Sequence, residues 1–359
     1  MPRLFGELEL IRQIRAAHTP AGARKRRSAK AGMGAGVVLG IGDDCAILRP
    51  RCGHEIVVTT DFSLEGRHFV RNVHPPESVG HRVLARGLSD LAAMGAKPLA
   101  CFLSLALPGD IPATRKGREW IGGFFTGFNA LTARYGVPLA GGDTSESPSP
   151  HILADIVLLG SAPAGRALRR STARAGDVLY VTGQLGGSAA ELAMLQKRGK
   201  LSPARHAPSG SNTNPHPHLY PQPRLALGQS LLRRKLATAC IDLSDGLSTD
   251  LKHLCEESNL GAEIEASALP IHPLAFGTAI DGRSRNKGRD PLSLGLHGGE
   301  DYELLFAASP SAHIPQSICG VPVTRIGILK RGKSISLIDG NGRSSRLPAR
   351  GWEHFAGKG

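Results

Sequence analysis

Aspartate recurs beside glycine, serine or threonine in five short motifs of the sequence. They read GDD at 42–44, TTD at 59–61, LSD at 88–90, GGD at 141–143 and DLSDG at 242–246. One Asp beside a small residue is typical of an ordinary turn or helix cap. Five such motifs with no Lys or Arg among them would repel one another, so they predict a bound divalent cation. Oxygen ligands without His or Cys favour magnesium over zinc.

Magnesium held by a few carboxylates commonly completes its coordination with water and with substrate phosphates. The motifs therefore indicate a nucleotide as the ligand. The sequence contains no GxxxxGK[ST] motif, no GxGxxG between a strand and a helix, and no protein-kinase motif set. These absences argue against P-loop enzymes, Rossmann dinucleotide binders and protein kinases.

Hydrophobic spacing predicts the helices and strands that would position the motifs. Helices are expected at 4–17, 76–94 and 114–135, and strands at 37–39, 46–48, 56–60, 99–107, 138–140 and 155–159. A second αβ region is expected to carry strands near 178–182, 239–241, 263–264, 302–307 and 323–328. Four motifs are expected as turns at or just after strands. Asp90 instead falls inside a helix, where a lone carboxylate is costly to bury.

The length of 359 residues predicts two domains, with a boundary near residue 162. No apolar run is long enough to cross a membrane, and the first residues lack the order of a signal peptide. We therefore expect a cytoplasmic protein without a membrane partner. The six cysteines are scattered and form no CxxC, which argues against a disulfide scaffold or a structural zinc site.

The formal net charge of +14 raises the possibility of nucleic-acid binding. Only residues 24–27 form a basic run. Aromatic residues make up just 4% of the chain, so few side chains are available to stack on the bases of a nucleic acid. We therefore predict no nucleic-acid partner and a basic surface that attracts small anions.

Two segments interrupt the pattern of elements. Residues 19–36 form a basic, glycine- and alanine-rich loop, and residues 198–223 are rich in Pro, Ser, Asn and His. The second composition predicts an insertion that cannot bury enough apolar area to become ordered. Its histidines, His206, His216 and His218, are expected in a solvated linker rather than in a metal site.

The motifs together resemble a known family. IGDDCAIL (41–48), TTDFSLEGRHF (59–69), LSDLAAMGAKP (88–98), GGDTS (141–145), IDLSDGL (241–247), GGEDYELLF (298–306) and GWEHF (351–355) occur in the order found in thiamine-monophosphate kinases. This family belongs to the aminoimidazole ribonucleotide synthetase superfamily. The resemblance implies an α+β fold of two αβ domains, with the N-terminal sheet pairing across a homodimer. Residues 1–161 would form the metal- and ATP-binding and dimerisation domain, and 162–359 the C-terminal αβ domain.

The resemblance also implies roles for individual residues. Implied magnesium ligands are Asp44, Thr59, Thr60, Asp61, Asp90, Asp143, Asp242 and Asp245. Implied ATP contacts are Tyr135, Gly142, Arg170 and Ser244, and implied contacts to the thiamine phosphate are His68, Glu300 and Trp352. No side chain is expected to act as a catalytic base.

The implied reaction is ATP-dependent phosphorylation of thiamine monophosphate to thiamine diphosphate, by direct in-line transfer assisted by several magnesium ions. A phosphate monoester has a second pKa of about 6, so this acceptor is already largely a dianion at cellular pH and needs no base. Two alternatives remain open from the sequence. One is another ATP-dependent enzyme of the same superfamily, and the other is a non-catalytic nucleotide-binding protein.

Overall fold

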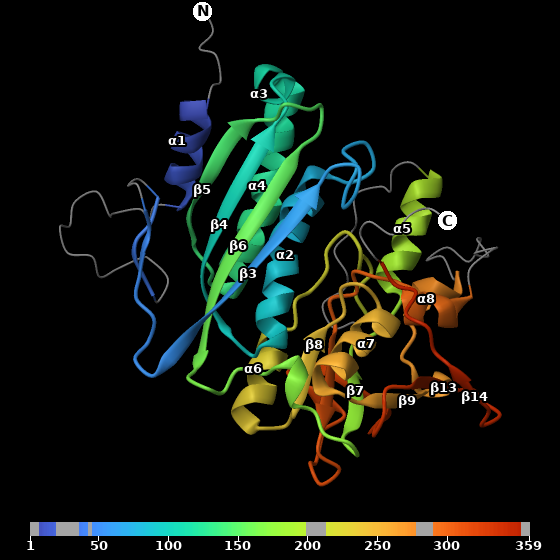
Figure 1. Cartoon of the computed structure of the whole chain (residues 1–359). Coiled ribbons are helices and arrows are strands. Elements are labelled where there is room, and N and C mark those ends of the chain that lie inside the picture. Colours follow the sequence, from blue (N-terminus) through green and yellow to red (C-terminus); the bar gives the residue numbers. More distant parts are fainter. Residues whose placement is uncertain (1–6, 19–35, 42–44, 199–212, 278–289, 353–359) are drawn as a thin grey trace, which may run out of the picture. The chain divides into compact units, whose positions relative to one another are not determined.

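The computed structural model describes residues 7–18, 36–41, 45–198, 213–277 and 290–352 (Figure 1). Asp44, His206 and nearly all of the basic segment 19–36 lie outside the described residues. The chain divides into two compact units. The first comprises Met1–Leu91 and Lys97–Gly165, and the second comprises Ala92–Ala96 and Arg166–Gly359.

The first unit is built on a four-stranded sheet in the order β3-β6-β4-β5. Its strands are β3 (His54–Leu64), β4 (Lys97–Leu107), β5 (Leu139–Glu146) and β6 (Leu153–Pro163). The pair β4–β5 is parallel and the other pairs are antiparallel. A separate two-stranded sheet joins β1 (Val37–Leu39) to β2 (Ile47–Leu48). The helices are α1 (Glu7–His18), α2 (Pro76–Ala93), α3 (Asp110–Ala113) and α4 (Arg115–Tyr135).

Helices α2 and α4 lie along one face of this sheet (Figure 1). Leu88 of α2, Phe124 and Phe128 of α4, and Ile156 and Leu158 of β6 are completely buried. Helix α4 begins after Thr114, whose hydroxyl accepts a hydrogen bond from Gly117 N at 3.1 Å. The apolar residues on one side of each helix and on alternate positions of the strands thus form the core of the unit.

Glycines allow α2 and α4 to approach each other closely. A Cβ added at Gly80 would lie 1.9 Å from Phe124 O, and one added at Gly127 would lie 1.8 Å from Glu77 O. No real Cβ can occupy such positions without moving a helix backbone. The two helices can therefore cross this closely only because Gly80 and Gly127 have no side chain.

The TTD and GGD motifs were expected as turns, and for these two motifs the prediction is wrong. Thr59 to Asp61 lie inside β3, which pairs with β6 over its whole length, and Gly141 to Ser145 lie inside β5. Position 142 requires a glycine, because the Cβ of any other residue would lie 1.9 Å from Leu103 O of the neighbouring strand. Asp90 lies inside α2, as expected.

The second unit contains a larger sheet in the order β14-β13-β9-β12-β7-β10-β8, with β11 pairing to β12. Its strands are β7 (Val178–Thr182), β8 (Ala239–Asp242), β9 (Gly261–Glu265), β10 (Leu304–Ala308), β11 (Ser317–Ile318), β12 (Val321–Lys330), β13 (Ile335–Ile338) and β14 (Ser344–Arg346). The pair β13–β9 is parallel and the other pairs are antiparallel.

The helices of this unit are α5 (Gly187–Arg198), α6 (Leu225–Arg234), α7 (Leu247–Ser258) and α8 (Pro291–His297). Short 3₁₀ turns are η2 (Arg170–Thr172), η3 (Ala266–Ala268) and η4 (Pro273–Phe276). Leu251 and Leu254 of α7 pack in one buried cluster with Ile241 of β8, Ile264 of β9 and Leu305 of β10. This core fixes the β8–α7 connection, which carries the DLSDG motif.

The polar segment 198–223 departs from its prediction where the structure describes it. Residues 213–223 are ordered against α5, and His218 and Leu219 are only 1% and 3% exposed. The prediction of a solvated linker is therefore wrong for His216 and His218, whose polar atoms find partners inside the unit. Residues 199–212 lie outside the described part.

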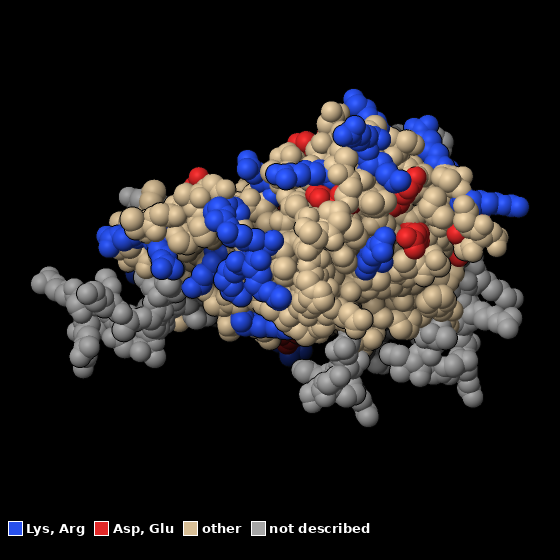
Figure 2. Space-filling view, turned by 90° about the horizontal axis from the view of Figure 1, so that it is seen from below, with Lys and Arg blue, Asp and Glu red and all other residues tan. Residues whose placement is uncertain are grey.

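Surface charge follows the composition. Figure 2 shows Lys and Arg spread over much of the viewed face, with Asp and Glu in smaller groups. Within the described residues, no helix has the length and apolar character required to span a membrane.

The close approach of α2 and α4 generates a stability prediction. We expect Gly80→Ala to lower the free energy of unfolding by about 2 kcal/mol, because the new methyl would overlap the backbone of α4. Gly122→Ala is the matched control, since a Cβ there meets nothing within 4 Å. It should be neutral or raise stability by about 0.5–1 kcal/mol. Urea denaturation of both variants tests this, and equal effects would contradict it.

Candidate functional site

In the first unit, a cluster of polar residues lies where β3 faces α2. Thr59 Oγ1 donates a hydrogen bond to Asp90 Oδ2, which joins the strand to the helix. Asp61, two residues further along the same face of β3, lies 3.4 Å from Nη2 of Arg86 on α2. Three predicted metal ligands thus meet on this face. Thr60 lies on the opposite face of β3, so its side chain does not join them.

Burial controls the charge of Asp61. Loss of solvation raises its pKa from 3.8 to about 6, against the lowering effect of Arg86. The neighbouring carboxylates of Asp90 and Asp155 raise the pKa further. Arg86 therefore does not supply enough positive charge to hold Asp61 fully ionised.

A second acidic row crosses the other face of the sheet. Phe62 of β3 pairs with Asp155 of β6, Asp155 pairs with Ser104 of β4, and Ser104 pairs with Asp143 of β5. Two strand spacings, about 10 Å, separate the backbones of Asp155 and Asp143. Burial raises the pKa of Asp155, and its Oδ1 is buried without a hydrogen-bond partner in the described part of the chain.

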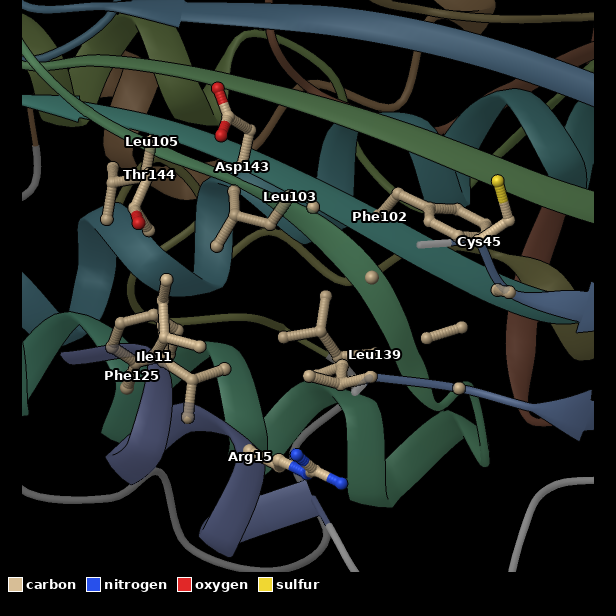
Figure 3. Close-up of a pocket in the computed structure, with 17 residues that line it drawn as sticks. Ile11, Arg15, Cys45, Phe102, Leu103, Leu105, Phe125, Leu139, Asp143 and Thr144 are labelled. Atoms are coloured by element: carbon tan, nitrogen blue, oxygen red, sulfur yellow. The ribbon is translucent and has the colours of Figure 1, made fainter. Parts of the chain in front are cut away.

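A pocket of about 610 Å³ opens beside Asp143 (Figure 3). The lining is mostly apolar and comes from α1, from β4, β5 and α4, and from residues 40–41 and 45–46. Gly142 and Asp143 line it from β5, and Arg15 of α1 brings a positive charge. A pocket of this size and character suits a small organic ligand that carries a polar group.

His68 lies just beyond the end of β3. Its Nδ1 accepts a hydrogen bond from Leu64 N at 2.9 Å, and its backbone oxygen accepts one from Arg82 Nη2 at 3.1 Å. An Nδ1 that accepts carries no proton, so the ring proton of the neutral imidazole is on Nε2. His68 and Arg86 both line a small cavity next to Ser63, which places His68 near the Asp61 cluster.

Tyr135 is not among the residues that line the large pocket. It ends α4, with the guanidinium of Arg134 5.5 Å from the centre of its ring. Tyr135 and Gly142, both predicted to contact ATP, therefore do not line that pocket together.

In the second unit, the turn from β8 to α7 gathers the DLSDG residues. Asp242 ends β8 and is 3% exposed, and Asp245 follows in the turn before the helix. Asp250 Oδ2 accepts hydrogen bonds from Asp245 N at 3.1 Å and Gly246 N at 3.0 Å. Burial, then Asp242 and Asp245, raise the pKa of Asp250 to about 8. A largely neutral Asp250 thus holds the turn in shape.

Glu300 and Trp352 reach this same turn from later parts of the chain. Glu300 N donates to Ser244 O at 2.7 Å, and Trp352 N donates to Asp245 O at 3.0 Å. The Trp352 side chain is half-exposed at 50%, a large apolar surface left open beside the turn. The structure therefore brings Asp242, Ser244, Asp245, Glu300 and Trp352 together.

Arg170 lies at the sheet edge next to β8. Its backbone oxygen accepts from Ser258 Oγ at 2.6 Å, and its positive charge lowers the pKa of the Cys240 thiol, an effect outweighed by burial. The side chain of Arg170 is exposed.

Sequence reasoning missed several residues of both groups. Asp155 is the one charged residue in the apolar strand LADIVLL, and that isolation is a signal the sequence does offer. Asp250 is detectable as an acidic residue in the first turn of a helix. Asp301 accepts from Gly186 N at 2.7 Å and Ser188 N at 3.2 Å, and burial raises its pKa to about 7. Only the folded chain reveals that role.

The donor atoms of the first unit fit magnesium. Asp61 and Asp90 supply carboxylates and Thr59 a hydroxyl, all hard oxygen donors, and magnesium is commonly held by one or two protein carboxylates. The raised pKa of Asp61 and the unpartnered Oδ1 of Asp155 both indicate missing positive charge. Among the described residues, which exclude Asp44, no three His, Cys, Asp or Glu side chains form a ready metal cluster.

Two family models match the chain in succession. The model for the N-terminal domain of AIR synthase related protein matches residues 42–162, and the model for the C-terminal domain matches residues 174–312. Fold and matched domains together define the class as AIR synthase related proteins, in agreement with the α+β fold expected from the sequence.

Known relatives narrow the class. The thiamine-monophosphate kinase of Salmonella typhimurium is 37% identical over 328 residues, covering 89% of this chain and 93% of that protein. The crystal structure of thiamine-monophosphate kinase from Stenotrophomonas maltophilia superposes with a TM-score of 0.72 at 34% identity, covering 95% of this chain and 98% of the other. The structure of AaThiL complexed with AMPPCP and TMP gives a TM-score of 0.69 at 27% identity, over 98% and 97%. The chain belongs to the thiamine-monophosphate kinase family.

The raised pKa of Asp61 predicts how stability depends on pH without metal. Because the folded-state pKa of about 6 exceeds the ordinary 3.8, ionisation costs the folded protein stability as pH rises from about 4 through 6. Asp61→Asn cannot ionise. In EDTA at pH 8 we expect its melting temperature to equal or exceed that of the wild type, by up to about 4 °C.

The matched control is Glu119→Gln, an exposed acidic residue on α4 of the same unit. Its difference from the wild type should stay small at every pH. Melting curves between pH 4 and 8 measure both variants, and a large loss of stability in Asp61→Asn would show that this carboxylate is structural.

Proposed function

We propose that the protein transfers the γ-phosphate of ATP to thiamine monophosphate and so forms thiamine diphosphate. The observation that carries this proposal is the match to thiamine-monophosphate kinases over about nine tenths of both chains. AaThiL, similar to this chain over nearly its whole length, was solved with both AMPPCP and TMP. This likeness favours a phosphotransferase over a non-catalytic nucleotide-binding protein.

The first unit is proposed to bind magnesium and the nucleotide. Thr59, Asp61 and Asp90 would hold one metal ion. Asp44, Thr60 and Asp143 are proposed from the motifs as ligands of further metal ions, with Thr60 and Asp143 on the other face of the sheet. Gly142, which lines the pocket beside β5, would contact ATP there. Tyr135 remains a weaker ATP contact in this proposal, and His68 would donate to the thiamine phosphate from Nε2.

The second unit is proposed to bind the thiamine moiety and further metal. Glu300 and the open face of Trp352 lie beside the β8–α7 turn, an arrangement suited to a charged heteroaromatic ligand. Asp242 and Asp245 of this turn would act as metal ligands. Ser244 and Arg170 are proposed to contact ATP.

The chemistry needs no side-chain base. The acceptor phosphate is its own nucleophile, and the obstacle is repulsion between it and the γ-phosphate, about 4 kcal/mol per pair of unit charges 4 Å apart at an effective dielectric of about 20. Bound magnesium would supply the neutralising charge. The residues of the chain then position the two phosphates and hold the oxygens in line.

We also propose that the protein is a cytoplasmic homodimer joined through β3. This strand is an edge of its sheet, and Ile56, Val58 and Phe62 expose 40%, 56% and 62% of their surfaces. A long apolar edge strand is a hazard unless another chain covers it. All six cysteines are free thiols, in keeping with a reducing compartment.

The reaction can be tested with the purified protein, ATP, magnesium and thiamine monophosphate. We expect thiamine diphosphate and ADP in equal amounts, and Asp61→Asn and Asp143→Asn should each reduce the rate more than about 100-fold while remaining folded. Glu119→Gln should remain active. Binding of ATP without any product would instead support the non-catalytic alternative.

The in-line route predicts inversion at phosphorus. ATP made chiral at the γ-phosphorus should yield a product of inverted configuration, because a single displacement has no phosphoenzyme. Initial-rate plots should intersect, as a ternary complex requires. Retention of configuration would mean two displacements and would contradict direct transfer, although the substrates would stand.

The dimer proposal predicts that a charge on β3 separates the subunits. Val58→Lys places a cation in the exposed apolar patch and should convert the dimer to a monomer at micromolar concentration. Phe276→Lys is the control, since Phe276 is equally exposed at 57% but lies in the second unit. Sedimentation equilibrium measures both masses, and a wild-type monomer would contradict the proposal.

A further inference from the structure

Residues 213–224 of the second unit are fixed by two buried carboxylates. Glu191 of α5 is 2% exposed, and its Oε2 accepts hydrogen bonds from His218 N at 2.7 Å and Leu219 N at 3.3 Å. Its Oε1 lies 2.7 Å from His216 Nδ1. At the end of the segment, Arg224 Nε donates to Glu303 Oε2 at 2.7 Å. The backbone around His218 is therefore held rigidly.

The His218 ring points from this segment to Glu300. It is 1% exposed, and its Nδ1 lies 3.0 Å from Ser188 Oγ and 3.4 Å from Glu300 Oε2. Ser188 N in turn donates to Asp301 Oδ1 at 3.2 Å. Glu300 and Asp301 are thus both connected to the start of α5, Asp301 directly and Glu300 through the imidazole.

Glu300 is a residue that needs such support. Its backbone has φ of +65°, a left-handed conformation that costs a non-glycine residue free energy. Its side chain is partly exposed, and a glutamate side chain free to change rotamer would lose considerable entropy on binding a ligand. A fixed neighbour close to the carboxylate, such as His218 at 3.4 Å, reduces this loss because it limits the positions open to the group.

We propose that His218 is a positioning residue that orients the Glu300 carboxylate for the thiamine moiety, with the proton on Nδ1 shared between Ser188 Oγ and Glu300 Oε2. The inference rests on the proposed function, which assigns Glu300 to that substrate. We expect His218 to affect the thiamine substrate rather than ATP, because its imidazole lies beside Glu300. The composition of the segment conceals this role, because residues 198–223 are rich in Pro, Ser and Asn.

The test compares His218→Leu with His218→Asn. Leu fills the space without a donor, so we expect KM for thiamine monophosphate to rise about tenfold, while kcat and KM for ATP change less than about twofold. Asn places an amide nitrogen near the position of Nδ1 and should bring KM back to within about threefold of the wild type. If His218→Leu fails to fold, His218→Gln replaces it as the variant without a donor at the Nδ1 position. The Gln side chain is longer, so its amide nitrogen lies beyond the position of Nδ1.

His216→Leu is the matched control. His216 lies on the same segment and contacts the same Glu191, but its imidazole bonds to Glu191 and not to Glu300, so KM should change less than about twofold. An equal rise of KM in His216→Leu, an equal rise for both substrates, or no rescue by Asn would reduce His218 to a structural role and overturn the proposal.

Crystal structures of the variants provide a readout independent of activity. The Glu300 carboxylate should be displaced or disordered in His218→Leu and in its wild-type position in His218→Asn. An unmoved carboxylate in His218→Leu would overturn the proposal even if KM rose. If the wild-type protein makes no thiamine diphosphate, the proposed function fails, and these structures still decide whether His218 orients Glu300.

Discussion

The desolvation of aspartate is the constraint on which the rest of this structure depends. Asp61, Asp250 and Asp301 are each buried enough to raise their pKa values by two or more units above 3.8, to about 6, 8 and 7. Such burial opposes folding unless other groups offset it. Backbone N–H donors support Asp250 and Asp301, whereas Asp61 is supported within the described residues by the guanidinium of Arg86 at 3.4 Å. The difference separates carboxylates that hold the fold from the one that we propose as a metal ligand.

The same constraint explains the surrounding architecture. The carboxyl groups of Asp250 and Asp301 are needed because two turns, after β8 and before α5, leave backbone N–H groups unpaired at helix starts. Each aspartate satisfies two of them. The strained backbone at Glu300 can persist because its own N–H donates to Ser244 O and the next residue, Asp301, is tied to the turn before α5.

Much of the site could be predicted from local sequence, because each motif carries its chemistry within a few residues. Asp90 lies within its helix and the DLSDG residues lie in a strand-to-helix turn, as expected. The TTD and GGD motifs were placed in turns because Gly and Asp are depleted in strands. Their backbone conformation is decided instead by pairing of β3 with β6 and of β5 with β4, which come from distant parts of the chain.

Composition misjudged residues 213–223 for a related reason. The average polarity of a segment indicates how little apolar area the segment can bury. It does not take account of a buried acceptor elsewhere in the chain, such as Glu191, which accepts hydrogen bonds from two backbone N–H groups of this segment. The signal for order lies in α5, outside the segment. Asp155 shows the opposite case, since one charge in an apolar strand can be noticed from sequence alone.

The attachment of Trp352 to the β8–α7 turn has a consequence for biosynthesis. The first unit consists almost wholly of residues up to Gly165, so the ribosome can release all of its sheet while the second unit is still being made. Trp352, whose N–H donates to Asp245 O, is made nearly two hundred residues after the end of the first unit. At usual translation speeds of about 5–20 residues per second, this delay is about 10–40 s. A chain whose translation stopped before Trp352 would keep the Asp61 cluster of the first unit. It would lack the hydrogen bond from Trp352 N to Asp245 O in the second unit.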